Sequence, residues 1–198
     1  MEIILASGSP RRKMLMDQVG IKCRVVVSGA DETIDGPPDV QVVELAKRKA
    51  LSVINSDECR GGILPPVIIA ADTLVYIDDE VLGKPKDKDD AFNMLKKLSG
   101  NKHTVYTGVA IVKTDKPNDI HSFVSKTDVY FRNLSDKEIL AYIETGEPFD
   151  KAGAYGVQDK GALLVSHIVG DFFTVVGLPI AKVYEVLRDI DTVSTLSF

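Results

Sequence analysis

Two neighbouring arginines near the start of the chain stand where a short strand gives way to a helix. They end the segment SGSPRR, residues 7–12, in which Ser9 suits the N-cap and Pro10 the first helical position. The unpaired amides at the start of a helix bind anions, and arginine matches a phosphate group in shape and charge. Because two arginines oppose the helix dipole unless an anion compensates them, we favour a phosphate-binding turn over an ordinary capped helix with solvated arginines.

A second candidate is Asp72, which interrupts an apolar run over residues 67–77. The run is apolar on both faces and predicts a central strand of a covered sheet. A carboxylate buried there is costly unless it meets a cation, a donor or a metal, so we favour a functional Asp72 over a structural, ion-paired one. In a regular strand its neighbour Thr73 points to the opposite face.

Four further positions carry groups that suit an anionic substrate or a metal. Glu32 lies in a turn-rich loop and has oxygens that a metal could use, although loop carboxylates are usually solvated. Lys84 lies between Gly83 and Pro85 in a turn, and Lys49 stands at the edge of an apolar stripe, where a surface lysine is the default. Gln158 ends the glycine-rich run over residues 146–158, and its amide has the donor and acceptor needed to read a nucleobase edge.

The inventory of reactive groups excludes several kinds of chemistry. The three histidines are far apart and fit no zinc motif, and the two cysteines form no CxxC pair. The Walker A motif of P-loop kinases and GTPases is also missing. Cationic groups with carboxylates alone favour a hard cation, Mg²⁺ or Mn²⁺, and the cleavage of a phosphoanhydride bond.

The elements that must position these groups alternate between strands and helices, with one long hairpin interrupting the order. Hydrophobic periodicity and turn residues predict strands over residues 2–6, 23–27, 67–77, 80–82, 103–113, 120–132 and 162–169. Helices are predicted from Pro10 to Gly20, over residues 39–55, after the cap Asp87, from the capping box of Ser135 and Glu138 to Glu144, and from Pro179 onward. The predicted fold is α/β, an extended mixed β-sheet flanked by helices.

Size and charge support a compact globular protein of ordinary composition. The 198 residues are 44% hydrophobic and 27% charged, which favours one globular domain over residues 1–198. The net charge of −5 argues against broad binding to nucleic acid. The apolar run over residues 67–77 is much shorter than the ~20 residues of a membrane-spanning helix. The N-terminal order, apolar residues before charges, is the reverse of a secretory signal, so we expect reduced thiols and a cytoplasmic protein.

Six segments, in this order along nearly the whole chain, resemble the Maf family of nucleoside triphosphate pyrophosphatases. They are ASGSPRR, AADTLV, GKP, HTVYTGV, GEPFDKAGAYGVQ and VVGLP. The resemblance implies two lobes around a cleft, akin to the inosine triphosphate pyrophosphatases. It also implies a cytoplasmic enzyme that uses Mg²⁺ or Mn²⁺ to hydrolyse a nucleoside triphosphate to the monophosphate and pyrophosphate. Related proteins are often dimers, so a homodimer is expected.

The resemblance also assigns roles to individual positions. Asp72 matches the proton acceptor of the family, and the sequence leaves open whether it acts as base or metal ligand. The positions that match the phosphate and metal region are Ser9, Arg12, Glu32, Lys49 and Lys84. We expect Glu32 and Asp72 to hold the metal, and Ser9, Arg12, Lys49 and Lys84 to contact phosphates.

Three positions bear on the choice of base. Arg12, Thr73 and Gln158 match the family branch that prefers dTTP and UTP, and the branch that prefers 7-methyl-GTP differs there. A pyrimidine substrate is therefore predicted, in a nucleotide-pool housekeeping role. One departure is Thr174, where many members carry asparagine. The alternatives are a phosphatase that releases orthophosphate and a nucleotide-binding regulator of cell division and septum formation.

Overall fold

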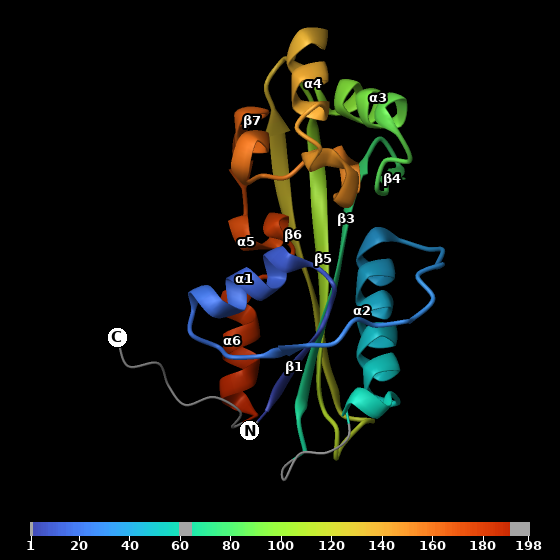
Figure 1. Ribbon diagram of the computed structural model, residues 1–198, viewed down its shortest axis with the longest axis vertical. Coiled ribbons are helices and arrows are strands. Elements are labelled where there is room, and N and C mark those ends of the chain that lie inside the picture. The colour runs from blue at the N-terminus through green and yellow to red at the C-terminus, as the bar shows by residue number, and fades with distance from the viewer. Residues whose placement is uncertain (1, 60–64, 191–198) are drawn as a thin grey trace. The chain divides into compact units, whose positions relative to one another are not determined.

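A seven-stranded mixed sheet runs through a computed structural model of the chain, which describes residues 2–59 and 65–190 (Figure 1). The strands are β1 (Ile3–Ala6), β2 (Arg24–Val25), β3 (Val67–Ile77), β4 (Glu80–Leu82), β5 (Lys102–Lys113), β6 (Ile120–Phe131) and β7 (Val165–Val169). They are ordered β2-β1-β3-β5-β6-β7, and β4 pairs with β3. The sheet is mixed because β1 is parallel to β2 and β3, whereas β4 and β7 are antiparallel to their partners.

Helices flank this sheet, as the sequence predicts. They are α1 (Pro10–Gln18), α2 (Pro38–Ile54), α3 (Lys88–Leu98), α4 (Asp136–Ile143), α5 (Phe172–Val176) and α6 (Ile180–Asp189). The described residues also contain short 3₁₀ helices, which are η1 (Asp57–Cys59), η2 (Glu147–Asp150), η3 (Ala152–Ala154) and η4 (Asp159–Leu163). Among the described helices, none is long and apolar enough to cross a membrane.

The chain divides into two compact units. The first unit comprises Met1–Asp72, Thr107–Val124 and Gly177–Phe198, and the second unit comprises Thr73–Tyr106 and Ser125–Val176. The three longest strands, β3, β5 and β6, each contribute residues to both units. That all 198 residues act as a single domain stays a prediction.

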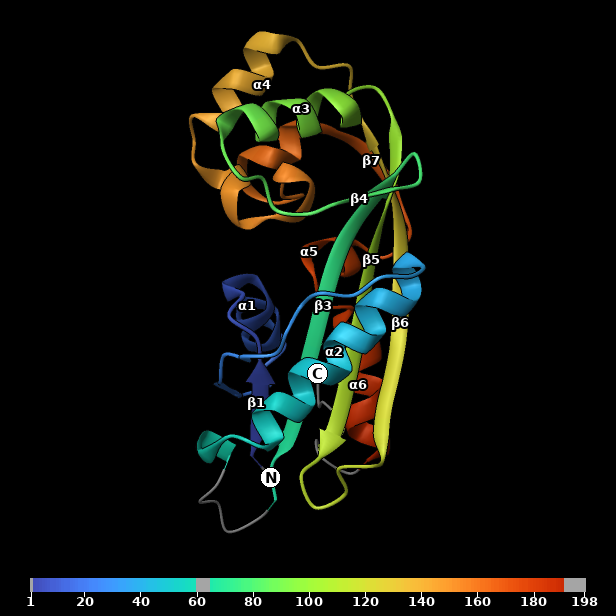
Figure 2. The same ribbon diagram turned by 90° about the vertical axis from the view of Figure 1, so that its right-hand side faces the viewer.

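The first unit is a helix–sheet–helix sandwich. Views in two directions place α2 on one side of the strands and α6 on the other (Figures 1 and 2). Alternate residues of the strands pack against the small side chains of α2. The cluster beneath α2 contains Ile4, Ala6, Val26, Ala46, Ala50, Val53, Ile68, Ala70, Ala110 and Val112. This packing holds α2, and therefore Lys49, against the strands.

Gly108 on β5 lets the backbone of α2 approach the sheet closely. A Cβ at this position would lie 2.3 Å from the carbonyl carbon and oxygen of Val42. Because backbone cannot rotate away as a side chain does, we expect Gly108→Ala to force α2 off the sheet. The expected loss is about 1–3 kcal/mol or more in the free energy of unfolding, measured by chemical denaturation. Gly29→Ala is the control, because a Cβ at Gly29 meets no atom within 4 Å.

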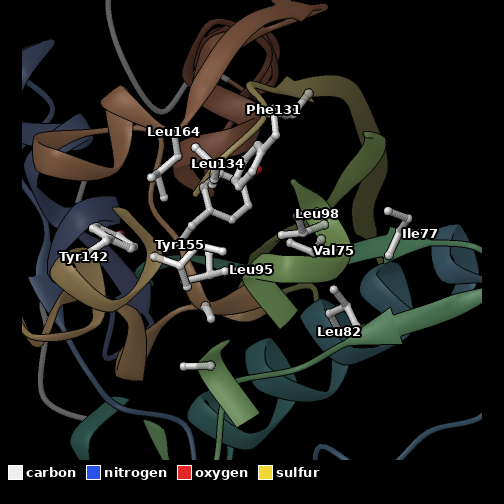
Figure 3. Close-up of a cluster of buried hydrophobic side chains, with 14 of the residues drawn as sticks. Val75, Ile77, Leu82, Leu95, Leu98, Phe131, Leu134, Tyr142, Tyr155 and Leu164 are labelled. Atoms are coloured by element: carbon white, nitrogen blue, oxygen red, sulfur yellow. The ribbon is translucent and has the colours of Figure 1, made fainter. Parts of the chain in front are cut away.

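The second unit has its own core, formed by one face of the sheet, α3, α4 and the 3₁₀ segments. Figure 3 shows Val75, Leu95, Leu98, Phe131, Tyr142 and Tyr155 converging there. His103, which is 1% exposed, lies in this core and its Nε2 is 2.7 Å from the hydroxyl of Tyr155. Burial lowers the pKa of His103 to about 4, although the charge of Asp128 opposes the shift. The histidine is therefore neutral at pH 7.

His103 should make folding sensitive to mild acid. Its ordinary pKa of 6.5 applies in the unfolded chain, so between pH 6.5 and about 4 the unfolded state binds a proton that the folded state does not. The free energy of unfolding should therefore fall as the pH falls through this window, by roughly 2 kcal/mol from pH 7 to pH 5. Urea denaturation at both pH values tests this. The His103→Gln protein has no histidine to protonate at this position, so between pH 7 and pH 5 its free energy of unfolding should fall by roughly 2 kcal/mol less than that of the wild type. An equal fall in both proteins would contradict the prediction.

Most predicted elements are confirmed, and two strand predictions need correction. Residues 162–169 do not form one strand, because η4 extends to Leu163 and β7 begins only at Val165. The strand predicted over residues 23–27 has only the two residues of β2. Ser9 does occupy the N-cap of α1, but its side chain makes no capping hydrogen bond.

Candidate active site

The turn between β1 and α1 fixes the guanidinium of Arg12. Arg12 is 8% exposed, donating from Nε to the carbonyl of Gly177 at 2.8 Å and from Nη1 to Oγ of Ser7 at 2.9 Å. The same Ser7 Oγ accepts the amide of Ser9 at 3.2 Å. The turn therefore builds a rigid cationic group at the start of α1, where the first helical amides also favour an anion.

Two carboxylates act on the charge of Arg12. Burial lowers the pKa of this arginine, whereas the negative charges of Asp72 and Glu32 raise it. An arginine remains charged in proteins despite such shifts. The two carboxylates come from different segments of the first unit, yet both act electrostatically on this guanidinium.

Lys49 joins the same two carboxylates directly. Its Nζ lies 2.6 Å from Oδ1 of Asp72 and 2.8 Å from Oε1 of Glu32. The side chains of Lys49 and Asp72 are only 12% and 15% exposed, whereas that of Glu32 is 64% exposed. The default expectation of a solvated surface lysine is therefore wrong, because Lys49 extends from α2 to the middle of β3.

The position of Asp72 follows from the strand that carries it. β3 is fully buried from Val67 to Ala71 and becomes partly exposed at Asp72 and Thr73. The strand is unbroken through both residues, so their side chains alternate between the two faces of the sheet. Asp72 is thus a largely buried carboxylate that meets a cation and still reaches solvent, as the sequence predicts.

The remaining predicted residues lie in the second unit. Thr73 is half-buried on β3, Lys84 is exposed in the turn after β4, and Gln158 is half-buried just before η4. The turn of Lys84 and the run that leads to Gln158 are joined, since the amide of Gly153 donates to the carbonyl of Gly83 at 3.0 Å. The second unit thus brings together the segments of Lys84 and Gln158.

Within the first unit, the structure brings together four of the predicted residues: Arg12, Glu32, Lys49 and Asp72. Ser9 belongs to the same turn as Arg12. The sequence analysis missed Ser7 as the residue that holds the guanidinium, although Ser7 stands in the segment that was singled out. A hydroxyl five residues before a buried arginine, across a helix start, is the signal that could have identified it.

Thr174 also has a defined role in the second unit. Its Oγ1 lies 2.8 Å from Oγ of Ser125 and 2.7 Å from Oδ2 of Asp171, and the residue is fully buried. The threonine therefore anchors the start of α5 on β6. This network explains how a residue other than asparagine satisfies the position.

The donor set of the first unit suits a hard cation in part. Glu32 and Asp72 provide carboxylate oxygens only, the ligand type that Mg²⁺ and Mn²⁺ prefer. Among residues 2–59 and 65–190, no three histidine, cysteine or acidic side chains are grouped as a metal site. Mg²⁺ is commonly held by one or two carboxylates completed by substrate phosphates and water, so two carboxylates are compatible with a cation that arrives with a nucleotide.

The fold places the protein among α/β proteins that share the architecture of a HAM1 protein from Coxiella burnetii. That structure superposes with a TM-score of 0.53 at 12% identity, over 96% of this chain and 99% of the other. The family model described as Maf-like protein matches residues 2–190. The chain belongs to the Maf family.

Two relatives are similar over almost their whole length. A dTTP/UTP pyrophosphatase from Thermosipho melanesiensis is 48% identical over 96% of this chain and 98% of its own length. A dTTP/UTP pyrophosphatase from Thermoanaerobacter sp. (strain X514) is 46% identical over 95% of this chain and 96% of its own length.

Proposed function

We propose that this protein hydrolyses dTTP and UTP to the nucleoside monophosphate and pyrophosphate, as a housekeeping enzyme of the cytoplasmic nucleotide pool. Membership of the Maf family and the names of the relatives support this activity. The observation that carries the proposal is the set of charges around Asp72. A largely buried carboxylate in mid-strand is bound by Lys49, which also binds Glu32, close to the buried guanidinium of Arg12.

The chemistry proposed for this set is attack of water on the α-phosphorus. The new bond joins the water oxygen to the α-phosphorus, and the bond from that phosphorus to the oxygen bridging to the β-phosphate breaks. Pyrophosphate leaves, and Asp72 accepts the proton of the attacking water. Arg12, Lys49 and Lys84 offset the negative charge that develops on the leaving group, and such preorganised charges are worth about 10²–10³ in rate each.

Glu32 and Asp72 are the residues proposed to hold Mg²⁺ or Mn²⁺. When bound, a divalent cation neutralises phosphate charge and makes the phosphorus more electrophilic. In its absence the ammonium of Lys49 neutralises the same two carboxylates. Lys49 then has to exchange carboxylate contacts for phosphate contacts when substrate arrives, which a flexible lysine stem permits.

Base selection is proposed to depend on Thr73 and Gln158 together with Arg12. The amide of Gln158 can both donate to and accept from a pyrimidine edge. Gln158 is half-buried just before η4, so its side chain is partly accessible to a ligand. Ser9 is proposed as a phosphate contact because it stands at the N-cap of α1, in the same turn as Arg12.

A panel of nucleoside triphosphates with Mg²⁺ or Mn²⁺ tests the proposal, with pyrophosphate and orthophosphate measured separately. We expect pyrophosphate and monophosphate from dTTP and UTP, with much slower turnover of purine nucleotides. Orthophosphate as the first product would identify a phosphatase instead. Binding without turnover across the panel would favour a regulatory protein. Size-exclusion chromatography with light scattering of the same sample tests the expected homodimer.

A further inference from the structure

The segment of residues 153–158 has a backbone that requires external support. Gly153 and Ala154 both adopt left-handed conformations, with φ of 67° and 59°, and Gly156 follows shortly after. Glycine leaves many conformations open to an isolated chain. The position of Gln158, at the end of this segment, therefore depends on the contacts that the segment makes with the rest of the second unit.

One anchor is the hydrogen bond between Tyr155 and His103. The Tyr155 hydroxyl and Nε2 of His103 are 2.7 Å apart, and the residues are 5% and 1% exposed. Both rings also pack edge-on against Phe131, with centroids 4.7 Å from Tyr155 and 5.1 Å from His103. Tyr155 thus ties the middle of the segment to β5 and β6 inside the core of the second unit.

A second anchor comes from Tyr142 on α4. Its hydroxyl accepts the amide of Gly156 at 3.2 Å. Gly161 closes over this bond so tightly that a Cβ there would lie 2.0 Å from the carbonyl oxygen of Gly156 and 2.9 Å from the Tyr142 hydroxyl. The backbone two residues before Gln158 is therefore held from both sides.

The first residue of the segment is held as well. The amide of Gly153 donates to the carbonyl of Gly83, next to Lys84. The two tyrosine anchors thus fix a segment that is itself joined to the turn of the candidate phosphate ligand. This arrangement places paired polar groups inside an apolar core, where an unpaired polar group would be costly.

We propose that His103, Tyr155 and Tyr142 are positioning residues that hold the 153–158 segment so that the amide of Gln158 is oriented for a pyrimidine base. This inference rests on the proposed function, because it assigns to the segment the task of reading the base. None of the three residues touches substrate; they act through the segment.

The protonation states are compatible with such a role. Burial keeps the pKa of Tyr155 and of Tyr142 well above the ordinary value, so both hydroxyls retain their protons. Nδ1 of His103 has no hydrogen-bond partner among the described residues. The bond between Nε2 and the Tyr155 hydroxyl can run in either direction, because neutral imidazole carries its proton on either nitrogen. His103→Gln introduces an amide with both a donor and an acceptor, so it can replace the histidine in either direction.

Four variants test the inference: Tyr155→Phe, Tyr142→Phe, His103→Gln and Ile139→Val. The first two remove one hydroxyl and keep the ring, and His103→Gln keeps a donor. Ile139→Val trims a fully buried side chain of α4 that makes none of these hydrogen bonds. The values to measure are kcat and KM for UTP, dTTP and GTP, together with the melting temperature of each protein.

Tyr155→Phe and Tyr142→Phe should each raise KM for UTP roughly tenfold and reduce the preference for UTP over GTP by a similar factor, with kcat within about threefold. His103→Gln should keep KM and base preference within about threefold of wild type. Ile139→Val should lower the melting temperature without changing either value. The inference is overturned if both phenylalanine variants keep the wild-type KM and base preference. It is also overturned if their activity falls only in proportion to the fraction of unfolded protein. A wild-type protein that turns over no nucleotide overturns the proposed function first, and this inference with it.

Discussion

Asp72→Asn should reduce turnover of UTP at least about 100-fold while the protein remains folded. Asparagine preserves the shape of the side chain, but its amide can neither accept the proton of the attacking water nor hold a metal as a carboxylate does. Positioned acids and bases contribute about 10²–10⁴ to rate, and Asp72 is proposed to be the proton acceptor. Because Lys49 keeps Glu32 as a partner at 2.8 Å, the substitution should not leave the lysine uncompensated.

The measurement is the initial rate of pyrophosphate release, with circular dichroism and a thermal melt to establish folding. Asp115→Asn provides a matched control. Asp115 is exposed in the turn between β5 and β6, so the same change of chemistry there should leave the rate unchanged. A folded Asp72→Asn protein that retains turnover within about tenfold of wild type would refute the role assigned to this carboxylate.

The elements that were predicted correctly are those whose signals are local. Ser135 and Glu138 form the full capping box that their spacing predicts, and Asp87 caps α3 by accepting the amide of Asp90. Asp78 and Asp79 both adopt positive φ, as a tight hairpin between β3 and β4 requires. In each case a few neighbouring residues determine the conformation, so the sequence is sufficient.

The elements that were missed depend on distant contacts. Residues 162–169 are apolar enough to resemble a strand, but Gly161 packs onto the Gly156 carbonyl and the Tyr142 hydroxyl. That contact keeps the chain in η4, and Leu163 is left 70% exposed. The short helix α5 was also missed, although Asp171 accepts the amides of Phe173 and Thr174. The N-cap signal of α5 is present in the sequence, but the five residues of the helix are too few to show the hydrophobic periodicity that identifies a helix.

The candidate site shows the same division. The sequence singles out Asp72 because a carboxylate within an apolar strand is anomalous whatever surrounds it. Its partner could not be found from local pattern, since Lys49 lies 23 residues away and resembles a surface lysine on its own helix. In the sequence, Glu32 likewise resembles an ordinary loop carboxylate, and only the folded structure shows that it pairs with the ammonium of Lys49. Family motifs supplied these residues where spacing and periodicity could not.

Lys49→Met should lower kcat/KM for UTP by about 10²–10³. Methionine approximates the lysine stem but removes the ammonium that lies 2.6 Å from Oδ1 of Asp72 and 2.8 Å from Oε1 of Glu32. A polyanionic substrate would then approach two carboxylates without that compensating charge, and the leaving pyrophosphate would lose one cationic contact. Removing one preorganised group of this kind typically costs about that factor.

Lys47→Met on the same helix is the matched control. Lys47 pairs with Glu44 three residues away, at 2.8 Å, on a partly exposed part of α2. Its loss should change the rate by less than about twofold, because exposed ion pairs of this kind contribute little. If Lys49→Met retains kcat/KM within about threefold of wild type, the proposed contact of Lys49 with phosphate is wrong.

Metal binding to the same variant should change in the opposite direction. In the folded protein the Lys49 ammonium occupies the carboxylate oxygens that are proposed to hold the cation, so metal and lysine compete for Glu32 and Asp72. Without nucleotide, Lys49→Met should therefore bind Mn²⁺ more tightly than wild type by calorimetry, even though it turns over substrate far more slowly. Weaker Mn²⁺ binding by the variant would mean that the two carboxylates serve Lys49 alone. Tighter Mn²⁺ binding together with lost turnover would show that Lys49 acts on the phosphates and is not needed to bind the metal. A misfolded site would instead lose both metal binding and turnover.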